Sequence, residues 1–106
     1  MLLYLRAAEV LSQGRDPGTA RAMAAEGVRM AGELGSVDGE MLFLALEGLA
    51  LVAGGEVDEG MRRLDEATAA AVAGEIAEAQ LATLICCHLI DACKRVRDST
   101  GRGSGA

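Results

Sequence analysis

The residues best suited to chemistry lie close together near the C-terminal end of the chain: Cys86, Cys87, His88 and Cys93. Cysteine and histidine are the usual zinc ligands, and a structural zinc site needs four of them to converge. On a helix Cys86 and Cys93 would share a face, whereas His88 would point about 200° away from Cys86 at 3.6 residues per turn. No second cluster of cysteines or histidines completes a site. We therefore expect no metal ion, and we interpret the three cysteines as small apolar core residues.

His88 and Glu47 are the side chains that could serve as a base or a charged anchor. A general base needs an orienting acid and a nucleophile, and His88, the single histidine, has only Asp91 one helical turn away. The glycine-rich stretches lack the lysine-containing pattern of phosphate-binding loops. We therefore expect no enzymatic activity and no cofactor. Glu47 stands alone in an apolar segment, which predicts either a structural ion pair with a residue such as arginine or recognition of a cationic ligand.

Glycine-containing breaks divide the chain into five predicted helices. These breaks lie at Gly14, Gly35, Gly54 with Gly55, and Gly74, and glycine supplies the left-handed conformation with which many helices end. The predicted helices cover about residues 2–13, 17–34, 38–53, 57–73 and 76–98. Short connections predict antiparallel neighbours, and no segment alternates as a strand would. We expect residues 1–98 to form one helical domain and the Gly- and Ser-rich residues 99–106 to be a disordered tail.

Composition favours the same all-α class and excludes several kinds of partner. Hydrophobic residues make up 51% of the chain but aromatic residues only 2%, which suits closely packed helices better than sheets. The net charge of −6 repels phosphate backbones, so we expect no nucleic-acid binding. The longest apolar run, residues 41–53, is shorter than the about 20 residues that span a membrane. Three cysteines in one predicted helix form no disulfide framework, which indicates a reducing, cytoplasmic compartment.

Aligning the chain with itself at an offset of 40 residues reveals a weak internal repeat. The alignment pairs residues of similar size: Leu3 with Phe43, Ala8 with Gly48, Leu11 with Leu51, Gly14 with Gly54, Ala20 with Gly60, and Gly27 with Ala67. Such a period predicts stacked helical hairpins, each of which buries one face against its neighbour. The small residues in these pairs resemble the small positions of tetratricopeptide repeats, where two helices approach closely. The resemblance implies a tetratricopeptide-like fold of about five antiparallel helices arranged as stacked helical hairpins.

A second resemblance covers residues 54–98. Segments 55–61, 64–67, 71–75 and 89–93 look like the helical-repeat region of large actinobacterial LuxR-type regulators. The DNA-binding and nucleotide-binding domains of those regulators have no counterpart in this sequence. The resemblance therefore implies a sensor or scaffold segment, and it implies neither DNA binding nor ATPase activity.

The functional prediction depends on the helix at residues 41–53, which is apolar nearly all round. Such a helix is typically covered on every side. In a single layer of hairpins its free side would line a concave apolar groove, which a soluble monomer rarely leaves open. We predict that a partner binds there, on Leu42, Ala45, Leu49, Val52, Ile85 and Leu89. The other interpretation is that the five helices close into a globule with this helix at its centre.

We therefore predict a protein-interaction or oligomerisation module that forms part of a larger regulator. Its partner is either an amphipathic helix or a second copy of the chain. A last helix with no helix to cover it favours a twofold homodimer. The alternative prediction is a small-molecule sensor with an apolar pocket near Glu47 and His88.

Overall fold

The computed structural model of the chain describes residues 2–12 and 16–105, with side chains for residues 4–10 and 16–97. This part of the chain contains five α-helices and no strand. They are α1 (Leu2–Ser12), α2 (Pro17–Glu33), α3 (Val37–Ala53), α4 (Val57–Val72) and α5 (Ala79–Gly105). The predicted all-α class is confirmed. The first four helices differ from their predicted bounds by no more than one residue at either end.

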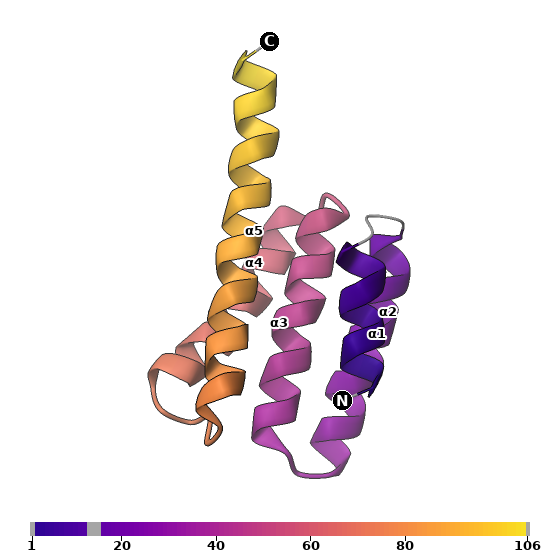
Figure 1. The fold of residues 1–106 in the computed structure, drawn as a ribbon, viewed down its shortest axis with the longest axis vertical. Helices are drawn as coiled ribbons and strands as arrows, with labels where there is room; N and C mark the ends of the chain where they lie inside the picture. Colours follow the sequence, from indigo (N-terminus) through magenta and orange to yellow (C-terminus); the bar gives the residue numbers. More distant parts are fainter. Residues whose placement is uncertain (1, 13–15, 106) are drawn as a thin grey trace.

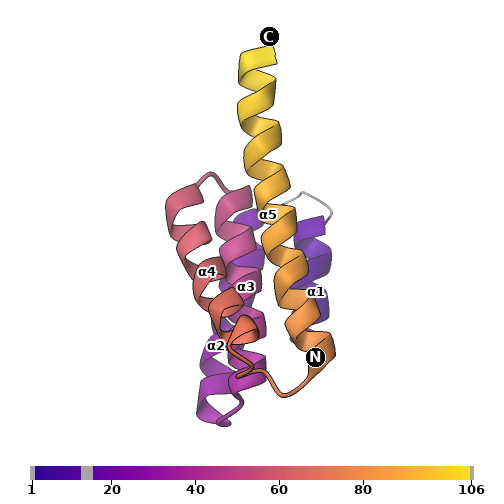
Figure 2. The same cartoon turned by 90° about the vertical axis from the view of Figure 1, so that its left-hand side faces the viewer.

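The helices form two layers of antiparallel neighbours. Figure 1 shows α1, α3 and α5 side by side, with α2 and α4 behind them, and the perpendicular view in Figure 2 agrees. Helix α3 packs against all four other helices. The short connections explain this order, because each helix must turn back along the one before it. The hairpin arrangement expected from the sequence is confirmed.

Each of three connections contains a glycine in the left-handed region: Gly35 at φ 72°, Gly55 at φ 99° and Gly74 at φ 81°. Side chains rarely adopt such angles, so these glycines end α2, α3 and α4 where the sequence predicted.

Ser36 caps the start of α3, and its Oγ accepts a hydrogen bond from the Gly39 backbone N at 3.1 Å. The Asp38 carboxylate accepts hydrogen bonds from the backbone N of Ala77 and of Glu78, each at 3.1 Å. Asp38 thereby ties the start of α3 to the segment that leads into α5.

The predicted close approach of small residues occurs between α3 and α4. A Cβ added to Gly48 would lie 2.7 Å from the carbonyl O of Gly60, and one added to Gly60 would lie 2.6 Å from the carbonyl O of Gly48. Any side chain at either position would therefore push the two backbones apart. Gly27 on α2 similarly leaves room for the ring of Phe43.

Helix α3 is the centre of the core. Its buried residues run from Leu42 to Val52, with only Phe43 partly exposed among them. Leu42 and Leu46 are among the largest fully buried side chains, together with Leu64 on α4 and Ile85 on α5. Helix α3 is apolar nearly all round because the four other helices pack around it.

Helix α5 differs most from its predicted bounds. It begins at Ala79 and continues to Gly105, through the segment predicted to be a disordered tail. Figures 1 and 2 show that its last part projects beyond the other helices. Ile76 is buried in the connection that precedes it. Within residues 2–12 and 16–105, no helix is long and apolar enough to cross a membrane.

Candidate functional site

The residues predicted to line an open groove are covered by the chain itself. On α3, the exposed fractions of Leu42, Ala45, Leu49 and Val52 are 6% or less, and Ile85 on α5 is fully buried. Leu89 is half-buried against the core. The reason is that α5 and α1 both pack on α3 (Figure 1), so no side of α3 is left free. The open groove is therefore wrong for the single chain, and the closed globule centred on α3 is correct.

Because Leu49 is buried, a charged substitution there would test the stability of the core and not the presence of an interface. The exposed fraction of Leu49 is 3%, so a glutamate there would place a charge in the core and unfold the protein. Leu49→Glu therefore cannot serve to locate an interface. Contact between these six residues and a partner stays a prediction.

A different apolar surface lies on the opposite side of α5. Ile85 and Ala92 face the core, whereas Leu84 and Ile90 are 36% and 57% exposed and Cys87 is exposed as well. We call the outward stripe the outer face of α5, and it consists of Gln80, Thr83, Leu84, Cys87 and Ile90. Figure 2 is viewed from the side of α5 that faces away from α3.

The outer face of α5 carries no charge over three helical turns. From Ala79 to Ile90 the sequence contains no Asp, Glu, Lys or Arg. The hydroxyl of Thr83 is already satisfied, because its Oγ1 donates a hydrogen bond to the carbonyl O of Ala79 at 3.0 Å. The nearest charge on this side is Asp91, one turn beyond Cys87, whose 48% exposed carboxylate pairs with Arg95 at 3.5 Å.

The exposed faces of α2 and α4 differ from the outer face of α5 because they carry ion pairs. On α2, the guanidinium of Arg29 forms ion pairs with Glu26 and Glu33, and its hydrogen bond to Glu26 lowers the pKa of that carboxyl. On α4, Arg62 pairs with Glu59 at 3.5 Å. Such charged surfaces are typical of helices that stay in water. The outer face of α5 differs from these charged surfaces, although single apolar side chains are exposed elsewhere as well, such as Leu5, Leu34 and Val72.

Charged residues flank the outer face of α5 at both of its ends. Glu75 and Glu78 precede the first turn and are exposed, while exposed Lys94 and Arg97 follow the apolar stripe. The acidic groups do not gather at one end of this face, because Glu78 comes seven residues before the buried Ile85 and the half-exposed Asp91 follows Ile90 directly.

The three cysteines do not behave as the core residues that the sequence suggested. All three are free thiols, and Cys87 and Cys93 are exposed while Cys86 is partly buried. The core-facing positions of α5 are taken by Ile85, Leu89 and Ala92. Within the part of the chain that the structure describes, no three His, Cys, Asp or Glu side chains come together to form a metal site.

His88 pairs with the N-terminal helix instead of acting with Asp91. Its Nε2 lies 2.6 Å from Tyr4 Oη, and its ring lies 5.9 Å from the Tyr4 ring. Burial lowers the pKa of His88, and the nearby Asp91 carboxylate partly offsets that effect. Burial also raises the pKa of Tyr4, to which Cys87 adds a smaller contribution. Both groups are therefore neutral at pH 7, so the tyrosine hydroxyl can donate to the imidazole.

Glu47 forms the structural ion pair that was one of its two predicted roles. Its Oε1 lies 3.3 Å from Nη1 of Arg63, and its side chain is 8% exposed. Arg63 also reaches Glu59 at 3.3 Å from the adjoining turn of α4. The carboxylate is thus held between α3 and α4 by a guanidinium from the same chain.

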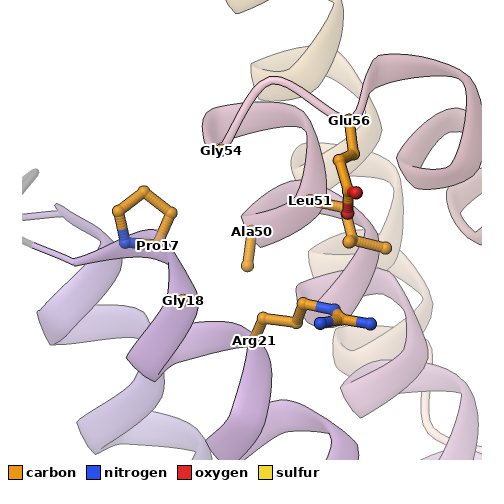
Figure 3. Close-up of a pocket in the computed structure, with 7 residues that line it drawn as sticks. All are labelled: Pro17, Gly18, Arg21, Ala50, Leu51, Gly54 and Glu56. Carbon is orange, nitrogen blue, oxygen red and sulfur yellow. The ribbon is translucent and has the colours of Figure 1, made fainter.

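A cavity of about 390 Å³ lies between the start of α2 and the end of α3 (Figure 3). Arg21 and Glu56 supply its charged groups, and the remaining lining is small or apolar: Pro17, Gly18, Ala50, Leu51 and Gly54. Neither Glu47 nor His88 lines it, so it is not the pocket that the sensor alternative predicted.

With this geometry in view, the chain can be compared with known proteins. No protein-family model, no curated protein and no solved structure matches it. The resemblance to regulator repeats therefore stays a prediction, and the function must be argued from the surface itself.

The outer face of α5 was not among the sites predicted from the sequence, although the run without charge from Ala79 to Ile90 was a signal for it. The hairpin pattern placed Ile85 and Leu89 in a groove, and Cys87 was interpreted as a core residue, whereas it is exposed.

Proposed function

We propose that the chain is a protein-interaction module that self-associates through the outer face of α5. The observation that supports this proposal is the uncharged face with Leu84, Cys87 and Ile90 exposed on it. Within the described chain, α5 packs on α3 and α4, and its His88 contacts Tyr4 of α1. Another helix placed on the free side would extend the same two-layer packing.

The strength of this contact can be bounded from its size. Each copy would bury three partly exposed apolar side chains, and each contributes roughly 1 kcal/mol when it leaves water. The sum of about 6 kcal/mol for two copies is partly offset by the loss of translational and rotational freedom. We therefore expect a weak dimer with a Kd in the millimolar range or above.

Light scattering during size-exclusion chromatography over a dilution series tests the proposal. We expect a dimer mass at high concentration that falls toward the monomer mass on dilution. Ile90→Glu should shift the protein to monomer because it places a charge in the contact. Val72→Glu is the matched control, since Val72 is a 79% exposed apolar residue on α4, away from this face. A monomer at all concentrations, or equal masses for wild type and Ile90→Glu, would overturn the proposal.

A further inference from the structure

We infer that the cavity between the start of α2 and the end of α3 binds a small zwitterion, a molecule that carries one carboxylate and one ammonium group. The carboxylate contacts Arg21 and the ammonium contacts Glu56, the two charged residues that line the cavity (Figure 3). None of its described lining residues lies on α5, so this inference is independent of the proposed self-association.

The guanidinium of Arg21 has no partner on its own helix. The positions one turn away on α2 hold a proline, a glycine and two alanines, none of which carries a charge. Arg29 on the same helix differs, because it has Glu26 and Glu33 one turn away and pairs with both. Within the part of the chain that the structure describes, no residue forms an ion pair or a hydrogen bond with the Arg21 side chain. That guanidinium is therefore available to a carboxylate from outside the chain.

The carboxylate of Glu56 is equally uncommitted, although the residue itself is fixed. Glu56 is at the N-cap of α4, yet its side chain forms no capping hydrogen bond. Its backbone N donates to the carbonyl O of Leu51 at 2.9 Å, which holds the residue against the end of α3. The acidic residue one turn further on, Glu59, is the one that pairs with Arg62 and Arg63. Among the described side chains, none pairs with the Glu56 carboxylate.

The two charges are separated by an apolar wall. Figure 3 shows the side chain of Leu51 between the carboxylate of Glu56 and the guanidinium of Arg21, and no ion pair joins the two. Leu51 and the adjacent Ala50 are buried, so the wall is part of the core and does not move aside. A ligand that reaches both charges must therefore carry a charged group at each end and a short apolar segment between them.

The opposite signs of the two charges select this class of ligand. A simple anion at Arg21 is repelled by the nearby carboxylate, and a simple cation at Glu56 is repelled by the guanidinium. A zwitterion satisfies both groups at once. The volume of about 390 Å³ is more than ten times the share of one water molecule in the liquid, about 30 Å³, so a small amino acid fits. Both charged side chains are exposed, which weakens each ion pair, and we expect a Kd in the millimolar range.

The first experiment titrates the full ¹⁵N-labelled chain with three probes and follows the backbone amides by NMR. Glycine, β-alanine and 4-aminobutanoate carry the same two charges at increasing separation. At least one of them should shift the amides of Gly18, Gly54 and Glu56 along a saturable curve. Butyrate and butylamine each carry only one of the charges, and at equal ionic strength they should bind at least fivefold more weakly. Saturation by none of the three zwitterions overturns the inference, as does equal binding of butyrate or butylamine.

The second experiment repeats the titration with variants of the two charged residues. Arg21→Gln and Glu56→Gln should each raise the Kd at least fivefold. The double variant Arg21→Glu/Glu56→Arg should bind more tightly than either single variant, because the zwitterion can enter in the reverse orientation. Arg62→Gln is the matched control, since its side chain is 76% exposed on α4 and does not line the cavity. Equal affinities for wild type and Arg21→Gln, or no recovery in the double variant, would show that this pair of charges is not the recognition site.

A third variant tests the place of binding without changing a charge. Gly54 has a φ of −85°, which any residue can adopt, and a Cβ there would lie 3.6 Å from the Cβ of Pro17. The side chain of Gly54→Leu therefore enters the cavity and should abolish the saturable shifts. Circular dichroism checks that the variant is folded. Binding that survives in folded Gly54→Leu would place the ligand elsewhere on the protein and overturn the inference.

Discussion

Tyr4 and His88 join the first helix to the last one, with 2.6 Å between Tyr4 Oη and His88 Nε2. The two helices flank α3 in Figure 1, and this bond joins them. The Tyr4 ring also meets the edge of Phe43 on α3, with ring centroids 6.0 Å apart and planes at 76°. The three rings together explain why the face of α3 that could have been a groove is covered.

Tyr4→Phe should destabilise the protein while leaving the ring packing in place. The variant removes the hydroxyl and leaves the largely buried Nε2 of His88 without its partner, which costs about 1–2 kcal/mol. Urea denaturation followed by circular dichroism measures this cost. If the midpoint is the same as for wild type, the bond does not contribute to stability in solution.

Stability should fall as the pH drops below the usual histidine pKa of 6.5. Burial lowers the pKa of His88 in the folded protein, so between that lowered value and 6.5 the unfolded chain binds more protons than the folded one. The neutral imidazole therefore makes its full contribution to the free energy of unfolding above pH 6.5. That contribution is lost as the pH falls toward the pKa of His88 in the folded protein. Thermal melting at a series of pH values checks this, and His88→Gln should remove the slope in that window. A slope that survives in His88→Gln would assign it to other groups.

Gly48→Ala should destabilise the protein, although alanine is the better helix former. The added Cβ would lie 2.7 Å from the Gly60 carbonyl O, and backbone cannot move aside cheaply. We expect a loss of about 2 kcal/mol from the strained contact. Gly32→Ala is the matched control, because its Cβ would have only a 3.7 Å contact with Glu40. That variant should gain up to about 1 kcal/mol from helix propensity, and a gain of equal size at Gly48 would contradict the close approach.

Arg63→Met should cost about 2 kcal/mol, because it leaves the buried carboxylate of Glu47 with no ion-pair partner. The double variant Glu47→Leu/Arg63→Met should recover most of that loss, since it removes the buried charge as well. Arg62→Met provides the surface comparison: its side chain is 76% exposed, and we expect a change of about 0.5 kcal/mol or less. Additive effects in the double variant would mean that Glu47 and Arg63 do not interact.

Asp38→Ala should loosen the attachment of α5 to the start of α3. The carboxylate accepts hydrogen bonds from two backbone N–H groups, of Ala77 and Glu78, and their loss costs about 2 kcal/mol. Asp58 has the same place in the first turn of α4, so Asp58→Ala controls for the helix dipole alone. Hydrogen exchange at Ala77 and Glu78 should quicken only in Asp38→Ala. Similar exchange in the two variants would show that the tie between α3 and α5 does not protect these amides.

Local sequence signals were enough to predict the five helices and most of their ends. Gly35, Gly55 and Gly74 could be recognised as helix ends because backbone conformation at a glycine is a local property. The contact between Gly48 and Gly60 was also predictable, since two helices in a short hairpin must meet and small residues mark where they do so. An arginine partner for Glu47 was one of two expected roles, because a buried charge requires compensation.

Only the tertiary structure decided which faces are covered. Whether Leu42 and Leu49 line a groove or a core depends on where α1 and α5 lie. The hydrogen bond between Tyr4 and His88 helps to place these two helices, and it joins residues far apart in sequence. Asp38 could not be distinguished from an ordinary helix cap, because its partners near residue 77 come close only after folding. The outward position of Cys87 follows from the same packing, since the rotation of α5 about its axis is set by Ile85 and Ala92 fitting against the core. Periodicity identifies a helix and its apolar residues, whereas the choice of the buried side is made by the helices around it.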